Sequence, residues 1–355
     1  MILPLPDPAQ PPFEQSAQAR IQLFQGPGKP FQLSTAALPE ELQPGEVLVK
    51  ISLATICGSD LHTVEGRRSA PAPCVLGHEA VGSVLRSARS GVPTGQRVTW
   101  TLADSCGHCA PCTDWHLPQK CEQLFKYGHA ALNDGCGLNG CYASHILLRP
   151  GTHIFPVPDS LPDAVAAPAN CALATMVNAL EILPDPCHRV LVQGGGLLGI
   201  YACAWLRHLG VREVFCTDLS PQRLALVAEF GGIPLTAGSL LPPVDLVIEV
   251  TGQSSVIPDG IKALRPGGHY VWAGMVHPDS RLDLTGEQVL RKCLTLRGVH
   301  NYAPHHLAAG LDFLATNQTR LPFGKLTSPA LPLERLNEAM DLARSRQWQR
   351  VALQP

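Results

Sequence analysis

The chain has 355 residues, of which 45% are hydrophobic and 16% charged, and its formal net charge is −2. This length allows two domains with separate hydrophobic cores, and the balanced charge provides no basic surface of the kind that binds nucleic acid or a membrane. The first residues carry no basic segment ahead of an apolar run, and no stretch approaches the length of a transmembrane helix, so we expect a cytoplasmic protein.

The first part of the chain is predicted to be rich in β-strands. Residues 1 to about 20 are rich in Pro, Gln and Ala and predict a loose leader. From Ile21 to about Leu148, short β-prone runs such as EVLVKISLATI and HEAVGSVL are broken by Gly and Pro. Parallel βαβ units are not evident in this part, so we expect a mostly antiparallel, barrel-like domain.

Three distant side chains are candidate ligands of a metal ion. Cys57 and His78 each follow a β-prone run, and Cys171 lies far downstream at the start of an apolar helical pattern. Thiolate and imidazole are ligands that zinc prefers, and two cysteines with one histidine would leave one coordination position open. This pattern indicates a catalytic zinc site.

Two further polar residues follow the first of these ligands. Ser59 and His62 come two and five residues after Cys57. A hydroxyl beside the metal and an imidazole that titrates near neutrality could together carry a proton to solvent. Alternatively, Ser59 and Asp60 are turn or helix-cap residues, and His62 is an ordinary, partly exposed histidine.

Thirteen cysteines are an odd number, and four of them are tightly clustered. Cys106, Cys109 and Cys112 are followed after eight residues by Cys121, in a Gly- and Pro-rich segment. Four thiolates can close a tetrahedral zinc shell, and closed shells are structural. A cluster of unligated thiols or a redox role for the CxxC pairs is the alternative. The remaining cysteines are interpreted as packing residues or unassigned thiols: Cys74, Cys136, Cys141, Cys187, Cys203, Cys216 and Cys293.

Beyond Ser160 the sequence pattern changes to alternating helices and strands. AVAAPANCALATMVNALEIL has helical periodicity, HRVLVQ predicts a buried strand, and Gly194, Gly196 and Gly199 form a GxGxxG motif at the start of a helix. The next strand, VREVFCTD, ends on Asp218, nineteen residues after Gly199. This context makes the motif a dinucleotide-binding fingerprint, in which the backbone approaches the pyrophosphate at the helix N-terminus.

The same fingerprint indicates which dinucleotide is bound. Asp218 would accept hydrogen bonds from the ribose hydroxyls and repel a 2′-phosphate, so NAD is expected rather than NADP. Arg223, five residues further on, could stack on adenine or pair with a phosphate.

The alternation continues to about Tyr302 and predicts a doubly wound parallel sheet. VIPDGIKALRPGG is expected to be a helix and HYVWAGM the next strand, while the two last helices and the strand QRVALQP are expected to return to the first domain. We therefore expect an α/β protein with a catalytic domain, 1–170 and 303–355, that contains a zinc lobe at about 104–123. A dinucleotide-binding domain, 171–302, would complete the chain, with the active site between the two domains.

These motifs in this order resemble the zinc-dependent medium-chain alcohol dehydrogenases, and the resemblance covers essentially the whole chain after the leader. The matching segments are Cys57–His62 (CGSDLH), Gly77–Glu79 (GHE), the four-cysteine lobe, Cys171 and the Gly194–Gly199 turn. The resemblance implies a GroES-like first domain, a Rossmann second domain, two zinc ions per chain and a homodimer or homotetramer.

The resemblance also implies roles for individual residues. Cys57, His78 and Cys171 would hold the catalytic zinc, Glu79 would be a close or alternate ligand, and Ser59 and His62 would relay the proton. Thr175 would flank the nicotinamide. The turn residues that would bind the cofactor are Gly194, Gly196, Leu197, Leu198 and Gly199.

Two positions differ from the common pattern. The last spacing of the zinc lobe is one residue longer, with Trp115 and His116 where a glycine is common, so we expect a small bulge. Cys141 stands where a glycine is frequent.

FKYGHAALND and APANCALAT further resemble a subgroup named for association with phosphonate catabolism. A substrate anion would then be met by Arg67, Arg68, Lys126 or His129, because Arg and Lys suit phosphoryl oxygens. The alternative is that these residues are solvated loop charges.

The expected activity is reversible oxidation of a small-molecule alcohol to a carbonyl with hydride transfer to NAD. A polyol or amino-alcohol dehydrogenase with the same zinc and cofactor machinery is one alternative. A non-catalytic nucleotide-binding protein that keeps the fold is the other.

Overall fold

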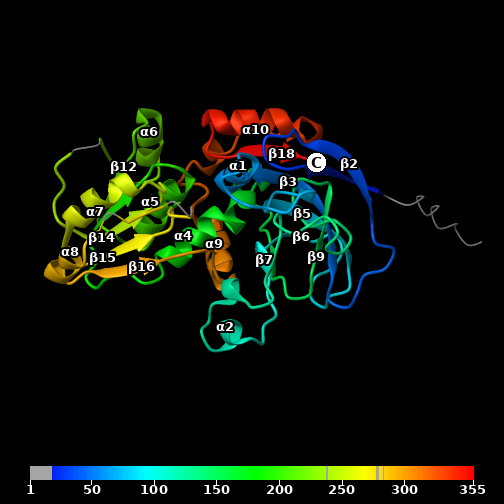
Figure 1. Cartoon of the computed structure of the whole chain (residues 1–355), viewed down its shortest axis with the longest axis horizontal. Helices are drawn as coiled ribbons and strands as arrows, with labels where there is room; N and C mark the ends of the chain where they lie inside the picture. The colour runs from blue at the N-terminus through cyan, green and yellow to red at the C-terminus, as the bar shows by residue number, and fades with distance from the viewer. Residues whose placement is uncertain (1–17, 237–238, 277–279, 283) are drawn as a thin grey trace, which may run out of the picture.

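The computed structural model describes residues 18–236, 239–276, 280–282 and 284–355. The expected leader lies outside these residues, except for its last three, which belong to the first strand, β1 (Gln18–Phe24). A β-rich part and a part built of alternating strands and helices lie beside each other, with α4 and α9 between them (Figure 1). None of the helices in these ranges is long and apolar enough to cross a membrane.

The β-rich part contains two main sheets. The smaller one has the order β2 (Gln32–Ala37), β1 and β4 (Cys74–Val75). The larger one has the order β10 (Ile154–Pro156), β6 (Arg97–Trp100), β5 (Glu79–Ser87), β3 (Val47–Ile56), β18 (Val351–Gln354) and β17 (Leu331–Pro332), and β9 (His145–Leu148) also pairs with β3. All pairings are antiparallel except that of β17 with β18. The predicted mostly antiparallel architecture is thus confirmed.

Strand β3 shows why this segment folds as it does. Val47, Val49 and Ile51 alternate with residues of the opposite face and are fully or almost fully buried in the core, together with Trp100 and Tyr142. The β-branched side chains suit a pleated, buried surface. The short helix α1 (Gly58–Val64) begins directly after this strand.

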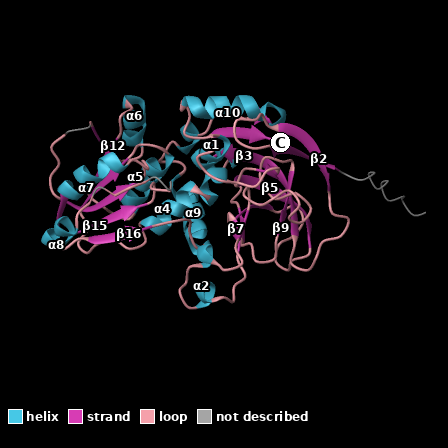
Figure 2. Ribbon diagram, viewed as in Figure 1, coloured by secondary structure: helices cyan, strands magenta, loops and turns pink. Residues whose placement is uncertain are grey.

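A small lobe projects from the β-rich part. It consists of the paired strands β7 (Ala103–Asp104) and β8 (Phe125–Lys126), the single-turn helix α2 (Ala110–Thr113) and the 3-10 turn η1 (Pro118–Lys120). Helix α2 lies at the bottom of the view in Figure 2. The segment holds the four clustered cysteines.

The second part is a six-stranded sheet with all pairings parallel. Its order is β13 (Ile233–Leu235), β12 (Glu213–Thr217), β11 (Arg189–Gln193), β14 (Val244–Glu249), β15 (Leu264–Trp272) and β16 (Thr295–Gly298). The connecting helices are α5 (Leu197–His208), α6 (Pro221–Glu229), α7 (Ile257–Ala263) and α8 (Gly286–Lys292). The chain order reverses at β11, and this is the doubly wound topology expected from the alternation.

Both faces of the parallel sheet are covered. Val190 and Val192 of β11 pack in one cluster with residues of α4 and α5, whereas Leu191 packs in another with Ile257 of α7. A strand buried on both faces is continuously apolar, as the VLV segment of β11 is.

The structure differs from the sequence expectations at two places. The segment expected as one helix from residue 164 to 183 is divided into α3 (Asp163–Ala166), the 3-10 turn η2 (Ala167–Asn170) and α4 (Ala172–Ala179). Cys171 has φ −133° and ψ −74° between the last two, so the helix restarts there. The second difference is β15, which begins at Leu264 because the residues before Pro266 are extended rather than helical.

The C-terminal segment returns to the β-rich part. Helix α9 (Pro304–Asn317) packs beside α4, and η4 (Phe323–Leu326), η5 (Leu333–Arg335) and α10 (Leu336–Ser345) follow. Strand β18 then pairs antiparallel with β3, with Val351 opposite Ile56. This pairing places the residue before β18 beside the end of β3, where Cys57 lies.

Candidate active site

Four of the predicted ligands converge at the end of strand β3. Cys57 caps the N-terminus of α1, Cys171 caps that of α4, and His78 and Glu79 lie where β5 begins. One ligand atom from each of these four residues lies within 4.8 Å of the others. Three separate segments of the chain therefore build one buried cluster.

The distance between the two sulfur atoms fits a shared zinc ion. Cys57 Sγ lies 3.9 Å from Cys171 Sγ, with no disulfide between them. Two thiolates bound to one tetrahedral zinc at about 2.3 Å would lie about 3.8 Å apart. Together with His78, which is 3% exposed, this donor set matches the chemistry that zinc prefers.

Asp60, which its sequence context indicates only as a turn or helix-cap residue, contacts several members of the cluster. Its carboxylate accepts hydrogen bonds from the Cys57 backbone N–H at 2.9 Å and from the Tyr142 hydroxyl at 2.8 Å, and it lies 3.5 Å from His78 Nδ1. A carboxylate beside a ligating histidine fixes the orientation and tautomer of the ring. Asp60 is therefore an orienting residue of the site.

The charges around His78 determine its protonation. Burial alone would lower the pKa of His78, but the Asp60 carboxylate and the Cys57 thiolate outweigh burial and raise the pKa to about 10. Burial would raise the pKa of Asp60, and the charge of His78 outweighs it, so that pKa lies below its ordinary value. A histidine that binds zinc is neutral, so zinc binding at this site releases a proton.

Arg350, which no sequence motif marks as a site residue, forms a buried ion pair with Glu79. Its Nε and Nη2 donate to the two carboxylate oxygens at 2.7 and 2.9 Å, and the Thr55 hydroxyl donates to the same carboxylate at 2.6 Å. Glu79 is fully buried and Arg350 is 6% exposed. Burial raises the pKa of Glu79 to about 7, because it outweighs the opposing effect of Arg350.

The Arg350 guanidinium also affects the pKa of the Cys57 thiol. Arg350 Nη2 lies 3.5 Å from Cys57 Sγ. The hydrogen bond with Cys171 and the positive charge of Arg350 hold the pKa of Cys57 well below its ordinary value. The pKa of Cys171 is raised well above its ordinary value, because it shares that hydrogen bond and is buried. The two thiols therefore share one hydrogen bond beside a buried positive charge, which favours a thiolate at this place.

The predicted relay and nicotinamide residues lie on the helices that the ligands begin. Ser59 and His62 are on α1, directly after Cys57. Thr175 is on α4 one turn after Cys171, and its backbone N–H donates to the Cys171 carbonyl at 3.0 Å. Cys57 and Cys171 cap these two helices, so helix geometry sets how far the three predicted residues lie from the sulfur ligands.

Basic side chains lie on one side of the cluster. Burial and the charge of Arg68 lower the pKa of Lys126 to about 8, and the thiolates of Cys171 and Cys57 are close enough to oppose this shift. The ring of His129 lies 5.6 Å from that of His78. Burial and then the charge of His78 lower the pKa of His129 to about 3, so its ring is neutral.

The second part of the chain contributes to this basic region. Lys120 Nζ of the lobe lies 2.6 Å from His300 Nδ1, which follows β16. Burial and the charge of Lys126 lower the pKa of His300 to about 4. Arg67, in contrast, forms an exposed ion pair with Glu65.

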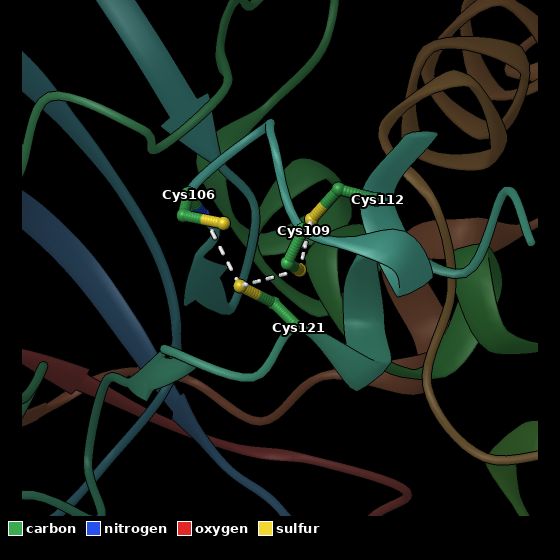
Figure 3. A group of neighbouring side chains, drawn as sticks. All are labelled: Cys106, Cys109, Cys112 and Cys121. Atoms are coloured by element: carbon green, nitrogen blue, oxygen red, sulfur yellow. Dashed lines mark hydrogen bonds between the residues drawn. The ribbon is translucent and has the colours of Figure 1, made fainter. Parts of the chain in front are cut away.

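The four lobe cysteines form a second donor cluster (Figure 3). Their sulfur atoms lie within 4.8 Å of one another, with Cys109 at 3.5 Å from Cys112 and 3.8 Å from Cys121. The Cys106 backbone N–H donates to Cys121 Sγ at 3.2 Å, and a backbone N–H at Glu122 lowers the pKa of Cys109 to about 6. Such N–H groups stabilise thiolates, so the donors fit a closed zinc shell.

The longer spacing in the lobe is accommodated by local backbone geometry. His116 has φ +54°, a left-handed conformation in which glycine is the usual residue, and Trp115 is 63% exposed. The extra residue therefore occupies a surface turn while the four sulfur atoms remain together. Cys141 is fully buried, and nothing in the structure explains its presence.

The glycine-rich turn after β11 is shaped as a dinucleotide site requires. Gly194 has φ +114°, and a Cβ on Gly199 would lie 1.8 Å from the Gly194 carbonyl oxygen. A Cβ on Gly196, the N-cap of α5, would meet nothing within 4 Å. The N-terminus of α5, where Leu197 and Leu198 present backbone N–H groups without helical partners, is thus open to an anion.

Asp218 lies next to this turn, as its position after β12 predicts. Its carboxylate accepts from the Gly195 backbone N–H at 2.7 Å and from the Ser220 N–H at 2.8 Å. Arg223 Nη1 lies 3.6 Å from Asp218 Oδ2. The carboxylate is therefore held at the edge of the turn, with the arginine paired to it.

Comparisons with known proteins agree with both halves of this arrangement. The family model for the alcohol dehydrogenase GroES-like domain matches residues 43–159, and that for zinc-binding dehydrogenase matches residues 198–316. The L-threonine 3-dehydrogenase of Stenotrophomonas maltophilia is 28% identical over 323 residues, which are 84% of this chain and 89% of that protein.

Solved structures give the same result. An alcohol dehydrogenase from Thermotoga maritima superposes with a TM-score of 0.88 at 28% identity, over 96% of this chain and all of that one. The alcohol dehydrogenase of Thermus sp. ATN1 has a TM-score of 0.82 at 27% identity, over 94% and 99% of the two chains. These likenesses extend over both parts of the fold.

Proposed function

We propose that this chain, which belongs to the zinc-dependent medium-chain dehydrogenases, holds its catalytic zinc with Cys57, His78 and Cys171. Members of this family transfer a hydride between an alcohol, or its carbonyl, and a nicotinamide cofactor. The observation that supports the assignment is the convergence of the three donors, with the two sulfur atoms 3.9 Å apart. Glu79 is held by Arg350, so its role is to fix that guanidinium beside Cys57 and not to bind metal in this arrangement.

A zinc ion bound there supplies Lewis-acid chemistry, which lowers the pKa of an alcohol substrate toward neutrality. Residues of the chain orient the ligands and transfer the proton. Asp60 orients His78, and Ser59 and His62 receive the hydroxyl proton and carry it toward solvent. Thr175 would flank a bound nicotinamide, and the cofactor would supply the hydride-transfer chemistry.

The lobe is proposed as the second zinc site. Cys106, Cys109, Cys112 and Cys121 would form a closed shell with no open position, so the metal would hold the lobe together and take no part in the reaction. This role fits the sequence of the lobe, which is too short and too rich in Gly and Pro to form a core of its own.

NAD is proposed as the preferred cofactor. The N-terminus of α5 would bind the pyrophosphate at Gly194, Gly196, Leu197, Leu198 and Gly199. The Asp218 carboxylate would accept from the ribose hydroxyls, and its negative charge disfavours a 2′-phosphate. Its contact with Arg223 leaves that arginine partly neutralised, which supports the same preference.

The substrate is proposed to be an alcohol that carries an anionic group. Lys126 lies near Arg68 and the two candidate thiolate ligands, and burial lowers its pKa to about 8. A buried cation is costly unless it is paired, and a substrate carboxylate or phosphonate would pair it. The threonine dehydrogenases related to this chain act on a substrate that also carries a carboxylate.

This proposal is tested with a set of alcohols that share one carbon skeleton and end in an anionic, neutral or cationic group. We expect NAD-dependent oxidation, with the highest kcat/KM for an anionic member, and a roughly tenfold lower value for that member in Lys126→Met. Arg67→Gln is the matched control, because Arg67 is nearby but paired with Glu65. Equal rates on neutral and anionic members would refute the substrate class, and no oxidation of any member with either cofactor would refute the activity.

The domain division is proposed at 1–170 with 303–355, and 171–302. The pairing of β18 with β3 supports the return of the C-terminal segment to the catalytic domain. We further propose a cytoplasmic homodimer or homotetramer, by similarity to the family. Sedimentation of the purified protein would test the assembly.

A further inference from the structure

A third cluster of metal-ligating side chains lies outside both zinc sites. Glu181 follows the C-terminal end of α4, and His305 and His306 lie in the first turn of α9. One ligand atom from each of the three residues lies within 4.8 Å of the other two. The cluster bridges two helices that pack against each other between the two parts of the chain (Figure 1).

The distances fit a common ion. Glu181 Oε1 lies 3.2 Å from His305 Nε2 and 3.4 Å from His306 Nε2. Nitrogen and oxygen ligands bound to a tetrahedral zinc at about 2.1 Å would lie about 3.4 Å apart. Both distances from the carboxylate oxygen therefore fit ligands of one metal ion, and the two ring nitrogens lie within 4.8 Å of each other.

His306 provides an independent observation. Its side chain is only 5% exposed, and its Nε2 lies 3.4 Å from Glu181 Oε1, an ion-pair contact that does not meet strict hydrogen-bond geometry among the described residues. A buried ring nitrogen whose polar neighbour is poorly aligned is incompletely satisfied. A metal ion between Nε2 and the carboxylate would bind the nitrogen lone pair and satisfy both groups.

The other nitrogen of the same ring is positioned to support metal binding. His306 Nδ1 lies 3.0 Å from the Ala303 backbone nitrogen and 3.1 Å from the Ala303 carbonyl oxygen. These two contacts require different tautomers, since Nδ1 accepts in the first and donates in the second. A hydrogen bond from Nδ1 to a carbonyl is the usual support of a histidine that binds metal through Nε2.

We propose that Glu181, His305 and His306 form a third metal site, which takes a divalent transition ion such as zinc. Two imidazoles and one carboxylate suit borderline ions and leave the remaining positions to water, because Glu181 and His305 are 47% and 66% exposed. The bound ion joins the end of α4 to the start of α9. Since α4 begins at Cys171, the ion stabilises the helix that carries a catalytic ligand.

The test uses the full-length zinc-loaded enzyme and cobalt(II) as the probe. We expect the protein to take up one further equivalent of cobalt at micromolar concentration, with weak visible bands and no thiolate-to-cobalt charge transfer, and to melt at a higher temperature with it. Glu181→Gln and His305→Gln should each weaken this binding by at least about tenfold. Both residues are exposed, so neither change threatens folding, whereas His306→Gln would alter a buried position.

His188→Gln is the matched control, because His188 is an exposed histidine outside the cluster. It should bind cobalt as the unaltered enzyme does. Absence of a further equivalent, or unchanged binding in both Glu181→Gln and His305→Gln, overturns the proposal. Failure of the two cysteine sites would show instead as less zinc in the starting enzyme, with the nitrogen- and oxygen-bound cobalt still present.

Discussion

Replacing Arg350 by methionine should destabilise the protein strongly, because it leaves the fully buried Glu79 carboxylate without its cation. Removing one partner of a buried ion pair costs about 3–5 kcal/mol in the free energy of unfolding. Methionine keeps most of the volume of the arginine stem, so the change measures charge rather than packing. The exposed pair of Arg335 and Glu338 is the matched control, and Arg335→Met should leave the free energy of unfolding almost unchanged, because solvent screens an exposed ion pair.

A second substitution separates the effect of the unpaired buried charge from the other effects of removing Arg350. In the double variant Arg350→Met with Glu79→Gln, no buried carboxylate remains, and most of the lost stability should return. The assay is urea unfolding of all variants at one fixed free zinc concentration, because bound metal contributes to the free energy. A loss below about 1 kcal/mol in Arg350→Met, or a double variant no more stable than the single one, would refute the reasoning.

The pH dependence of this loss has a defined sign. The pKa of Glu79 is raised to about 7 in the folded protein, so its neutral form is favoured by folding and stability from this group falls as pH rises through 7. Without Arg350, whose charge lowers that pKa, the carboxyl would be even harder to ionise. The destabilisation by Arg350→Met should therefore be larger at pH 8.5 than at pH 6.

Three further outcomes are expected. Gly199→Ala should destabilise the fold and abolish NADH binding, because the added Cβ would lie 1.8 Å from the Gly194 carbonyl oxygen. Gly196→Ala should fold normally and bind NADH more weakly. Unfolding experiments and NADH fluorescence titrations distinguish the two variants. Asp218→Asn should lower the ratio of kcat/KM with NAD to that with NADP by roughly tenfold, and an unchanged ratio would count against the role of this carboxylate. At pH values above about 8, Lys126 loses its charge, so the KM for an anionic alcohol should increase. The KM for a neutral alcohol of the same skeleton should not change over this pH range. Initial rates measured across pH test this prediction.

Local signals were sufficient for much of the fold and for choosing candidate ligands that the structure brings together. The apolar run at β11, the glycines after it and Asp218 after β12 predict the parallel sheet and its cofactor turn, because each requires a particular residue type at a fixed place in the chain. The four closely spaced lobe cysteines likewise have few uses other than metal binding. Cys57, His78 and Cys171 followed from ligand chemistry and from the resemblance to the family.

The residues that support those ligands could not be found in this way. Arg350 reaches Glu79 only because β18 pairs with β3, and no local pattern marks one arginine among many as buried. Asp60 looks like an ordinary helix-cap residue in sequence, and its contacts with Tyr142 and His78 depend on the tertiary structure. The start of β15 at Leu264 was missed because strand pairing with β14 overrides the apparent helical pattern.

The central claim is that Cys57, His78 and Cys171 share one zinc ion. Diffraction data collected on either side of the zinc absorption edge test it directly. The account predicts a strong anomalous peak about 2.3 Å from both sulfur atoms and about 2.1 Å from a ring nitrogen of His78, in addition to a peak among the four lobe cysteines. An enzyme that oxidises its alcohol at full rate with no peak between Cys57 and Cys171 would contradict it.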